Sequence, residues 1–189
     1  MSLRPRSRSI RRRDSVPAPA AASVSAPVSV AGGMAGAFAE LLRHNLVDVA
    51  PDHRSGPVFV QQAEGAWRLD TDAAALVARR GLKAQAIDDW LAVAHLPRQG
   101  FYAGLRLTAS TFSRKGKDEA LDPAVTERLL RQSALMVNAA EVFGDGAAAW
   151  MTRPHPLLGG DTPLDAGSNE YGGAQVREIL AAIQYGGVV

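Results

Sequence analysis

The side chains of this sequence that could do catalytic or metal chemistry are not spaced for it. Its carboxylates include adjacent pairs such as Asp88–Asp89 and Asp118–Glu119. Neighbours on a helix face different ways, so we interpret these pairs as solvated rather than as a general acid and base. None of the four histidines has the spacing of a metal-ligand motif, and we expect each on the surface or in a loop: His44, His53, His95 and His155.

Other catalytic motifs are also missing from the sequence. It contains no cysteine, which excludes disulfides, thiolate zinc sites and thiol catalysis and makes the cytoplasm the default location. Gly144-Asp145-Gly146 has no predicted strand before it, and the sequence has neither a phosphate-binding glycine loop nor a nucleophile elbow. The sequence therefore predicts a binding protein rather than an enzyme, with no metal and no cofactor.

Charge is the chemistry that the sequence does concentrate. Residues 79–117 hold eight basic and two acidic residues, a net charge of +6, whereas residues 118–189 hold four basic and ten acidic residues, a net charge of −6. The first of these segments suits a polyanion and the second repels one. This division predicts two separate binding functions.

The basic segment contains a predicted pair of short helices. Phe101 and Leu105 are its apolar residues, Gly104–Thr108 reads as a tight turn, and a second helix begins at about Ala109, capped by Thr108. A helix of about eight residues is about 12 Å long and fits a major groove. The segment resembles the helix-turn-helix of Xre-like DNA-binding proteins, although a solvated basic face or a scaffold without DNA contact is the alternative. The candidate DNA-binding residues are Thr108, Ser110, Thr111, Ser113, Arg114, Lys115 and Lys117.

The stretch from Trp150 to Asp165 is the second candidate site. Three prolines and the Gly159-Gly160 pair favour a fixed loop with almost no helical register. Trp150, Leu157 and Leu158 give the loop apolar side chains that we expect to be buried. Either the loop is a helix connection docked on its own core, or it is a surface shaped to fit a partner.

Apolar periodicity predicts the helices that position these two sites. Residues 1–33 are expected to be disordered and to act as a solvated tail, a basic arm on DNA or a targeting segment. No run of eighteen apolar residues is present, so no membrane span is expected. The predicted elements are a helix over 34–47, a hairpin over 58–69, a helix over 72–80, a helix with Ile87, Trp90, Leu91 and Ala94 on one face, a long helix from Pro123 to Gly144, a short one over 147–151, and a last one with Val176, Ile179, Leu180 and Ile183 on one face.

Short motifs over about residues 72–189 resemble the toxin-binding domain of Xre/MbcA/ParS-type antitoxins. Two departures from the pattern are His155, where an asparagine is usual, and Asn169-Glu170, where a threonine is common before the last helix. The motifs are Leu121-Asp122-Pro123, Glu127-Arg128-Leu129-Leu130-Arg131, Ala140-Glu141-Val142-Phe143-Gly144, Trp150-Met151, Arg153-Pro154-His155-Pro156, Leu158-Gly159-Gly160, Thr162-Pro163-Leu164-Asp165 and Ile183-Gln184-Tyr185-Gly186.

The resemblance implies a function. Members of this family are antitoxins encoded with RES-domain toxins, which degrade NAD or use it for ADP-ribosylation, and they cover the NAD site of the toxin and repress the shared operon. Carried over by position, the docking surface is Trp150, Pro154, His155, Leu158, Gly159, Gly160 and Pro163, and the tail nearest the toxin's pocket is Tyr185, Gly186, Gly187, Val188 and Val189. The alternative is a stand-alone helix-turn-helix transcriptional regulator.

The expected fold is all-α and divides into three parts. Residues 1–57 form a flexible arm and a short helix, residues 58–120 an Xre-like helix-turn-helix region, and residues 121–189 the toxin-binding domain. The expected partners are a RES-domain toxin, operator DNA and a second copy of the chain, because operators of such modules are two-fold symmetric.

Overall fold

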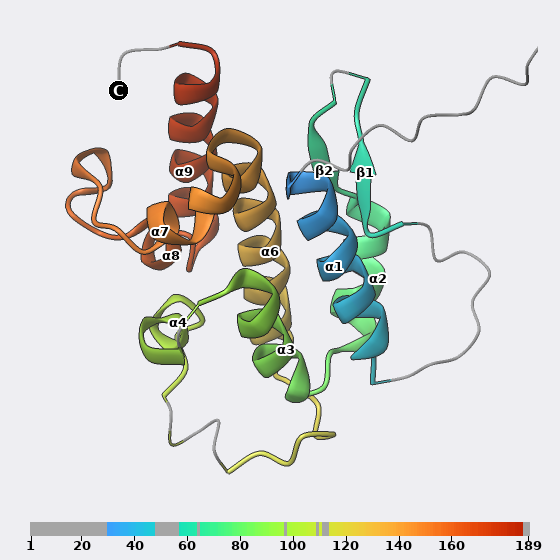
Figure 1. Cartoon of the computed structure of the whole chain (residues 1–189). Helices are drawn as coiled ribbons and strands as arrows, with labels where there is room; N and C mark the ends of the chain where they lie inside the picture. The colour runs from blue at the N-terminus through green and yellow to red at the C-terminus, as the bar shows by residue number, and fades with distance from the viewer. Residues whose placement is uncertain are drawn as a thin grey trace, which may run out of the picture.

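Residues 30–47 and 57–186, apart from Glu64, Pro97, Ala109 and 111–113, are described by the structure, a computed structural model of the chain (Figure 1). The fold is all-α with one small hairpin, as predicted. Its helices are α1 Val30–His44, α2 Thr71–Arg80, α3 Gln85–Ala94, α4 Arg98–Gly104, α6 Pro123–Phe143, α7 Ala147–Met151, α8 Pro163–Ala166 and α9 Glu170–Gln184, with 3-10 turns η1 Gly144–Gly146 and η2 Pro156–Leu158.

The long helix α6 is the axis of the molecule. The Asp122 side chain accepts a hydrogen bond from the Ala124 amide at 2.8 Å, and Pro123 occupies the first turn, where its missing N–H has no cost. The helix ends at Gly144, whose φ of 55° is unfavourable for other residues. Both predicted ends are therefore confirmed. In Figure 1, α6 runs between α9 on one side and α1 and α2 on the other, and each of these helices packs against it.

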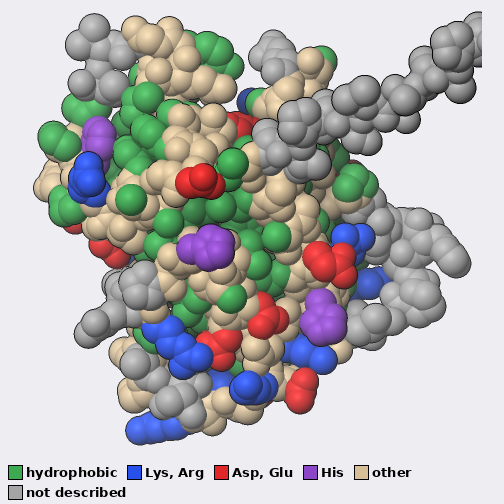
Figure 2. All heavy atoms as spheres, viewed as in Figure 1, with side chains coloured by type: hydrophobic (Ala, Val, Ile, Leu, Met, Phe, Trp, Pro, Cys, Tyr) green, Lys and Arg blue, Asp and Glu red, His purple; other side chains and the backbone are tan. Residues whose placement is uncertain are grey.

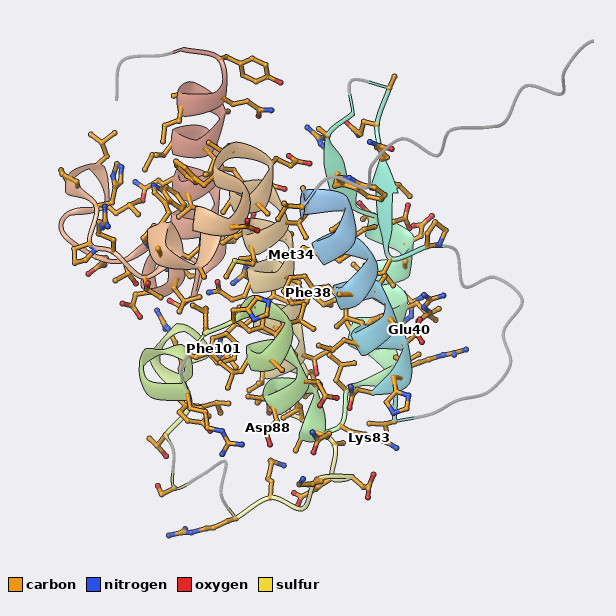
Figure 3. All side chains as sticks on the ribbon, in the orientation of Figure 1. Met34, Phe38, Glu40, Lys83, Asp88 and Phe101 are labelled. Carbon is orange, nitrogen blue, oxygen red and sulfur yellow. The ribbon has the colours of Figure 1, made fainter. Side chains whose placement is uncertain are left out.

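Aromatic side chains join α1, α3 and α4. The Trp90 ring stacks on Phe101 with 4.2 Å between ring centroids and on Phe38 with 5.4 Å, and all three side chains are buried. The Trp90 Nε1 donates to Ser133 Oγ on α6 at 2.8 Å, so the buried indole N–H is paired. Figure 3 shows Phe38 and Phe101 reaching toward α3 from the two neighbouring helices. The apolar face predicted for α3 is confirmed as core.

The first helix begins earlier than predicted and belongs to the core. Residues 30–33, expected to be disordered, form the first turn of α1, so that part of the prediction is wrong. The reason is that Ala31 and Gly32 are small and buried, which leaves no apolar signal in the sequence. Further along α1, Phe38 and Leu42 are fully buried, and Asn45 Nδ2 donates to the Asp89 carboxylate at 2.9 Å. The remaining residues of the predicted arm, 1–29 and 48–56, lie outside the described residues.

The predicted hairpin and the helix after it are confirmed. Strands β1 Phe59–Gln61 and β2 Trp67–Leu69 pair antiparallel, with Phe59 opposite Leu69. Asp70 then caps α2 by accepting the Ala73 amide at 2.8 Å, and Gly81 ends α2 with a φ of 79°. Among the described residues, no helix has the length and apolar character that a membrane span requires.

Candidate functional site

The corner, which we define as residues 150–165, holds the first set of predicted site residues. Backbone N–H and C=O groups within the corner bond to one another. The His155 amide donates to Asp161 O at 3.0 Å, and the Gly160 amide donates to His155 O at 3.2 Å. Gly159 and Gly160 have φ values of 68° and 92°, which few other residues adopt. The backbone of the corner is therefore held in one conformation without a partner.

The expectation that the corner has almost no helical register is wrong at two places. Pro156 begins the 3-10 turn η2, and Pro163 begins α8. Proline at a first helical position removes an amide that has no intrahelical acceptor there, so it starts these turns rather than preventing them. Each turn is also capped from the residue before it. His155 Nδ1 accepts the Leu157 amide at 3.3 Å, and Thr162 Oγ1 accepts the Asp165 amide at 3.1 Å.

Burial divides the side chains of the corner into anchors and a surface. Met151, Leu158, Pro163 and Leu164 are buried and anchor it to the core. Leu157, which was expected to be buried, is 54% exposed, because the caps of η2 leave it on the outer side of the turn. Leu157 is thus a surface residue that the sequence analysis did not include in the site. Its one sequence signal is the pair Leu157-Leu158, in which a tight turn can bury only one member.

Trp150 lies between these two classes. Its ring is half-buried, stacks on Phe143 at 5.1 Å between centroids and meets His155 edge-on at 6.1 Å. Trp150 therefore packs on the core with one part and borders the surface with another. The predicted residues Pro154, Gly159 and Gly160 are exposed beside it, so the corner brings together all seven docking residues carried over from the resemblance, with Leu158 and Pro163 underneath.

The corner is fixed to α6 by buried polar contacts. Gln132 Nε2 donates to Leu164 O at 2.8 Å, and Arg131, 9% exposed, donates to Gly167 O at 3.4 Å. Arg131 also forms ion pairs with Glu127 and, at 3.1 Å, with Glu170. A hydrogen bond from Arg177, at 2.7 Å, is the main cause that lowers the pKa of Glu170 below its ordinary value. This network fixes the positions of the corner, α6 and the start of α9 relative to one another.

The predicted tail begins at the other end of α9. Tyr185 is 75% exposed, and Gly186 has a φ of 77° that turns the backbone out of the helix. Gly187, Val188 and Val189 lie outside the described residues. Tyr171, 87% exposed at the start of α9, is a second large surface side chain that the sequence analysis did not single out.

The start of α9 explains one departure from the family pattern. Asn169, which stands near the place of the usual threonine, accepts the Gly172 amide at 3.0 Å through its side chain. Asparagine is as good an N-cap as threonine, so the helix start is preserved.

The predicted DNA-binding segment is described in part. Helix α4 is observed, with Phe101 and Leu105 buried, and Thr108 Oγ1 lies 3.1 Å from Ser110 Oγ. Ala109, Thr111 and Ser113 of the predicted second helix lie outside the described residues. Arg106 has a φ of 50°, an uncommon value for a residue other than glycine, and it is exposed at the turn.

Basic side chains on this segment are partly paired with acids. Lys115 Nζ lies 2.8 Å from the Glu119 carboxylate and donates to Ala120 O at 3.0 Å, and its hydrogen bond is the main cause that lowers the pKa of Glu119. Arg114 and Lys117 are exposed. Figure 2 shows blue and red side chains mixed along the lower edge of this face. The net positive charge is therefore less concentrated in space than the sequence suggests.

No cluster of three or more histidine, aspartate or glutamate side chains that could hold a metal occurs within the described ranges.

Comparison with known proteins gives three matches. Residues 138–186, which contain the corner and α9, match the model of the antitoxin Xre/MbcA/ParS C-terminal toxin-binding domain. A protein of Sphingobium sp. (strain YBL2) called "Prs ADP-ribosylating antitoxin" is 25% identical over 122 residues, which are 58% of this chain and 77% of that protein. "Antitoxin Xre" of Pseudomonas putida is 32% identical over 76 residues, 39% of this chain and 48% of that protein. The chain thus spans about half the length of the Pseudomonas protein.

Proposed function

We propose that this chain is an antitoxin of the Xre/MbcA/ParS type, and that it binds a RES-domain toxin through the corner and the end of α9 and blocks the toxin's NAD site. The observation that carries the proposal is the preformed corner. Its backbone is closed by its own hydrogen bonds, and it exposes Leu157 beside the half-buried Trp150 and His155.

A preformed apolar surface favours binding because little conformational entropy is lost on association. Aromatic and apolar anchors at the centre of an interface contribute most of its binding free energy. The end of α9 adds Tyr185, and the net negative charge of residues 118–189 would complement the positive charge that an NAD site needs for its anionic ligand. The toxin's chemistry, NAD degradation or ADP-ribosylation, is set by the toxin and not by this chain.

Co-purification tests the proposal. The chain is co-expressed with the protein encoded by the neighbouring open reading frame, which the proposal expects to carry a RES domain, and the antitoxin is captured. We expect wild type to bring down the toxin and Leu157→Asp to weaken the complex at least about tenfold, because a carboxylate would be desolvated at the interface. Val47→Asp is the matched control, since Val47 is an exposed apolar residue, 40% exposed, near the end of α1. Equal toxin recovery by Leu157→Asp and wild type would exclude the corner as the docking surface.

We also propose that the segment around α4 binds operator DNA as a homodimer and represses the operon. The net charge of +6 over residues 79–117 supports this role, with Thr108, Ser110, Thr111, Ser113, Arg114 and Lys117 as candidate contacts. Lys115 is held by Glu119 and is not counted among them. A stand-alone transcriptional regulator would show the DNA binding alone. Absence of a co-purifying toxin together with tight operator binding would favour that second function.

A further inference from the structure

A groove that the proposed function touches only at the end of α9 lies between the hairpin, α2, α6 and α9. It has a volume of about 810 Å³. Leu130 and Ala134 of α6 line it together with small residues from both neighbouring helices, and we call it the alanine groove. Its alanines are Ala66, Ala74, Ala75, Ala78, Ala134 and Ala181. Apart from Tyr185, none of the toxin-docking residues named above lines it.

The walls of the groove suit an apolar, uncharged occupant. Its alanine side chains are small and apolar, so they leave the volume of the groove open and offer a charged side chain no partner. Residues 16–29 of this protein read VPAPAAASVSAPVS and carry no charged and no aromatic residue. The three prolines of this segment have no N–H group, so fewer of its backbone groups need a partner in a groove that offers no strand edge.

The start of α1 belongs to the same part of the molecule as one end of the groove. Residue 29 precedes α1, and α1 packs beside β1 and β2 (Figure 1). Ala66 and Trp67 of this hairpin line the groove. From Glu141 to Glu127 along α6 the groove extends about 21 Å, at 1.5 Å per residue. Fourteen residues of a proline-rich chain reach roughly 43 Å, so residues 16–29 can turn the corner from α1 and run the full length.

The charged groups at the end of the groove away from the hairpin suit the basic start of the chain. At the far end lie the partly exposed carboxylates of Glu127, Glu170 and Glu178, which outnumber Arg131 and Arg177. A segment entering from α1 would deliver the six arginines of residues 4–13 to these carboxylates.

We propose that residues 16–29 bind in the alanine groove of their own chain, with the arginines of residues 4–13 at its acidic end. The tether makes the contact intramolecular, so its effective concentration is in the millimolar range and weak contacts suffice. The docked segment would join α2 to α9 across α6 and hold the arginines away from DNA. This proposal is independent of the toxin.

Paramagnetic labelling of the full chain tests the proposal. Because the sequence has no cysteine, Ala20→Cys gives one site for a spin label. We expect the methyl signals of Ala78, Ala134 and Ala181 to be lost and that of Ala92, exposed on α3, to be retained. Ala181→Trp, an exposed position in the groove, should restore the Ala78 and Ala134 signals, whereas the control Ala92→Trp should not.

Two outcomes overturn the proposal. Retained signals at all three groove alanines in the labelled protein would show that the groove is empty. In a second experiment, spin-labelled protein without isotope enrichment is mixed with isotope-enriched wild type. Equal signal loss in this mixture would show that the segment enters a second copy instead. Unchanged melting of Ala181→Trp is required as the folding check.

Discussion

At the scale of single residues, ion pairs decide which basic side chains of the segment 79–117 are free to contact DNA phosphates. Lys115 is held by Glu119 and by the Ala120 carbonyl, whereas Arg114 and Lys117 are exposed. The sequence gives all three the same weight because they lie within four positions of one another. Only the fold shows that the chain from Gly116 to Ala120 turns back and brings a carboxylate to Lys115.

This difference predicts unequal effects on operator binding. Each phosphate contact contributes about 0.9 to the slope of log affinity against log salt. We expect Arg114→Ala and Lys117→Ala each to reduce the slope by about one unit. Lys115→Ala should leave it nearly unchanged, since Glu119 already neutralises that ammonium. Binding isotherms at several salt concentrations check this, and a full unit lost in Lys115→Ala would contradict the role assigned to its ion pair.

The sequence identified the residues of the corner, but it did not show which of their side chains are exposed. Proline and glycine marked the corner, and the family motifs selected its members. The sequence did not show that Leu157 is exposed while Leu158 is buried. This difference depends on the caps that His155 and Thr162 provide to η2 and α8. A histidine side chain acting as an N-cap has no pattern in the sequence that separates it from a surface histidine.

At the scale of elements, the helices with strong end signals were predicted well. Asp122-Pro123 and Gly144 bound α6, and Asp70 and Gly81 bound α2, as the capping rules require. The start of α1 was missed because Ala31, Gly32 and Gly33 are small and bury little surface each. The short turns η2 and α8 were missed because they are three and four residues long, below the length at which periodicity is informative.

The junction of α8 and α9 predicts a difference between two helical glycines. A Cβ at Gly172 would lie 2.1 Å from the Ala166 carbonyl oxygen, whereas a Cβ at Gly36 in α1 would meet nothing within 4 Å. Gly172→Ala should therefore destabilise the fold by about 1–3 kcal/mol through overpacking. Gly36→Ala should stabilise it by up to about 1 kcal/mol, because alanine loses less backbone entropy in a helix.

Denaturant unfolding of the two variants measures this difference. Both changes add one methyl group to a helix, so helix propensity is matched between them. Equal free energies of unfolding for Gly172→Ala and Gly36→Ala would mean that α9 can move away from α8 without cost. The close approach at Gly172 would then not fix the corner.

At the scale of the whole molecule, the core crosses the predicted boundary between the N-terminal arm and the rest of the chain. Phe38 of α1 stacks on Trp90, and Trp90 bonds to Ser133 of α6. The sequence showed the apolar face of each helix and could not show which faces meet, since the partners lie 43 or more positions apart. For the same reason the alanine groove, formed by segments from Ala66 to Tyr185, was not predictable.

The proposed antitoxin function predicts that docking and blocking are separable. The corner is fixed to α6 through Arg131 and Gln132, while the chain leaves α9 at Gly186 with a φ of 77°. Deleting Gly186–Val189 removes no described core contact, so we expect unchanged thermal stability and continued co-purification with the toxin. We also expect loss of inhibition of the toxin's NAD-consuming activity, because the tail no longer enters the pocket.

The matched comparison is Leu157→Asp, which should lose co-purification and inhibition together, since the corner supplies the binding free energy. Toxin activity assays with each purified variant, at antitoxin concentrations above and below that of the toxin, distinguish the two roles. Full inhibition by the truncated chain would show that the corner alone closes the NAD site. Loss of binding on truncation would instead make the tail part of the anchor, because a plug that only blocks contributes little to affinity.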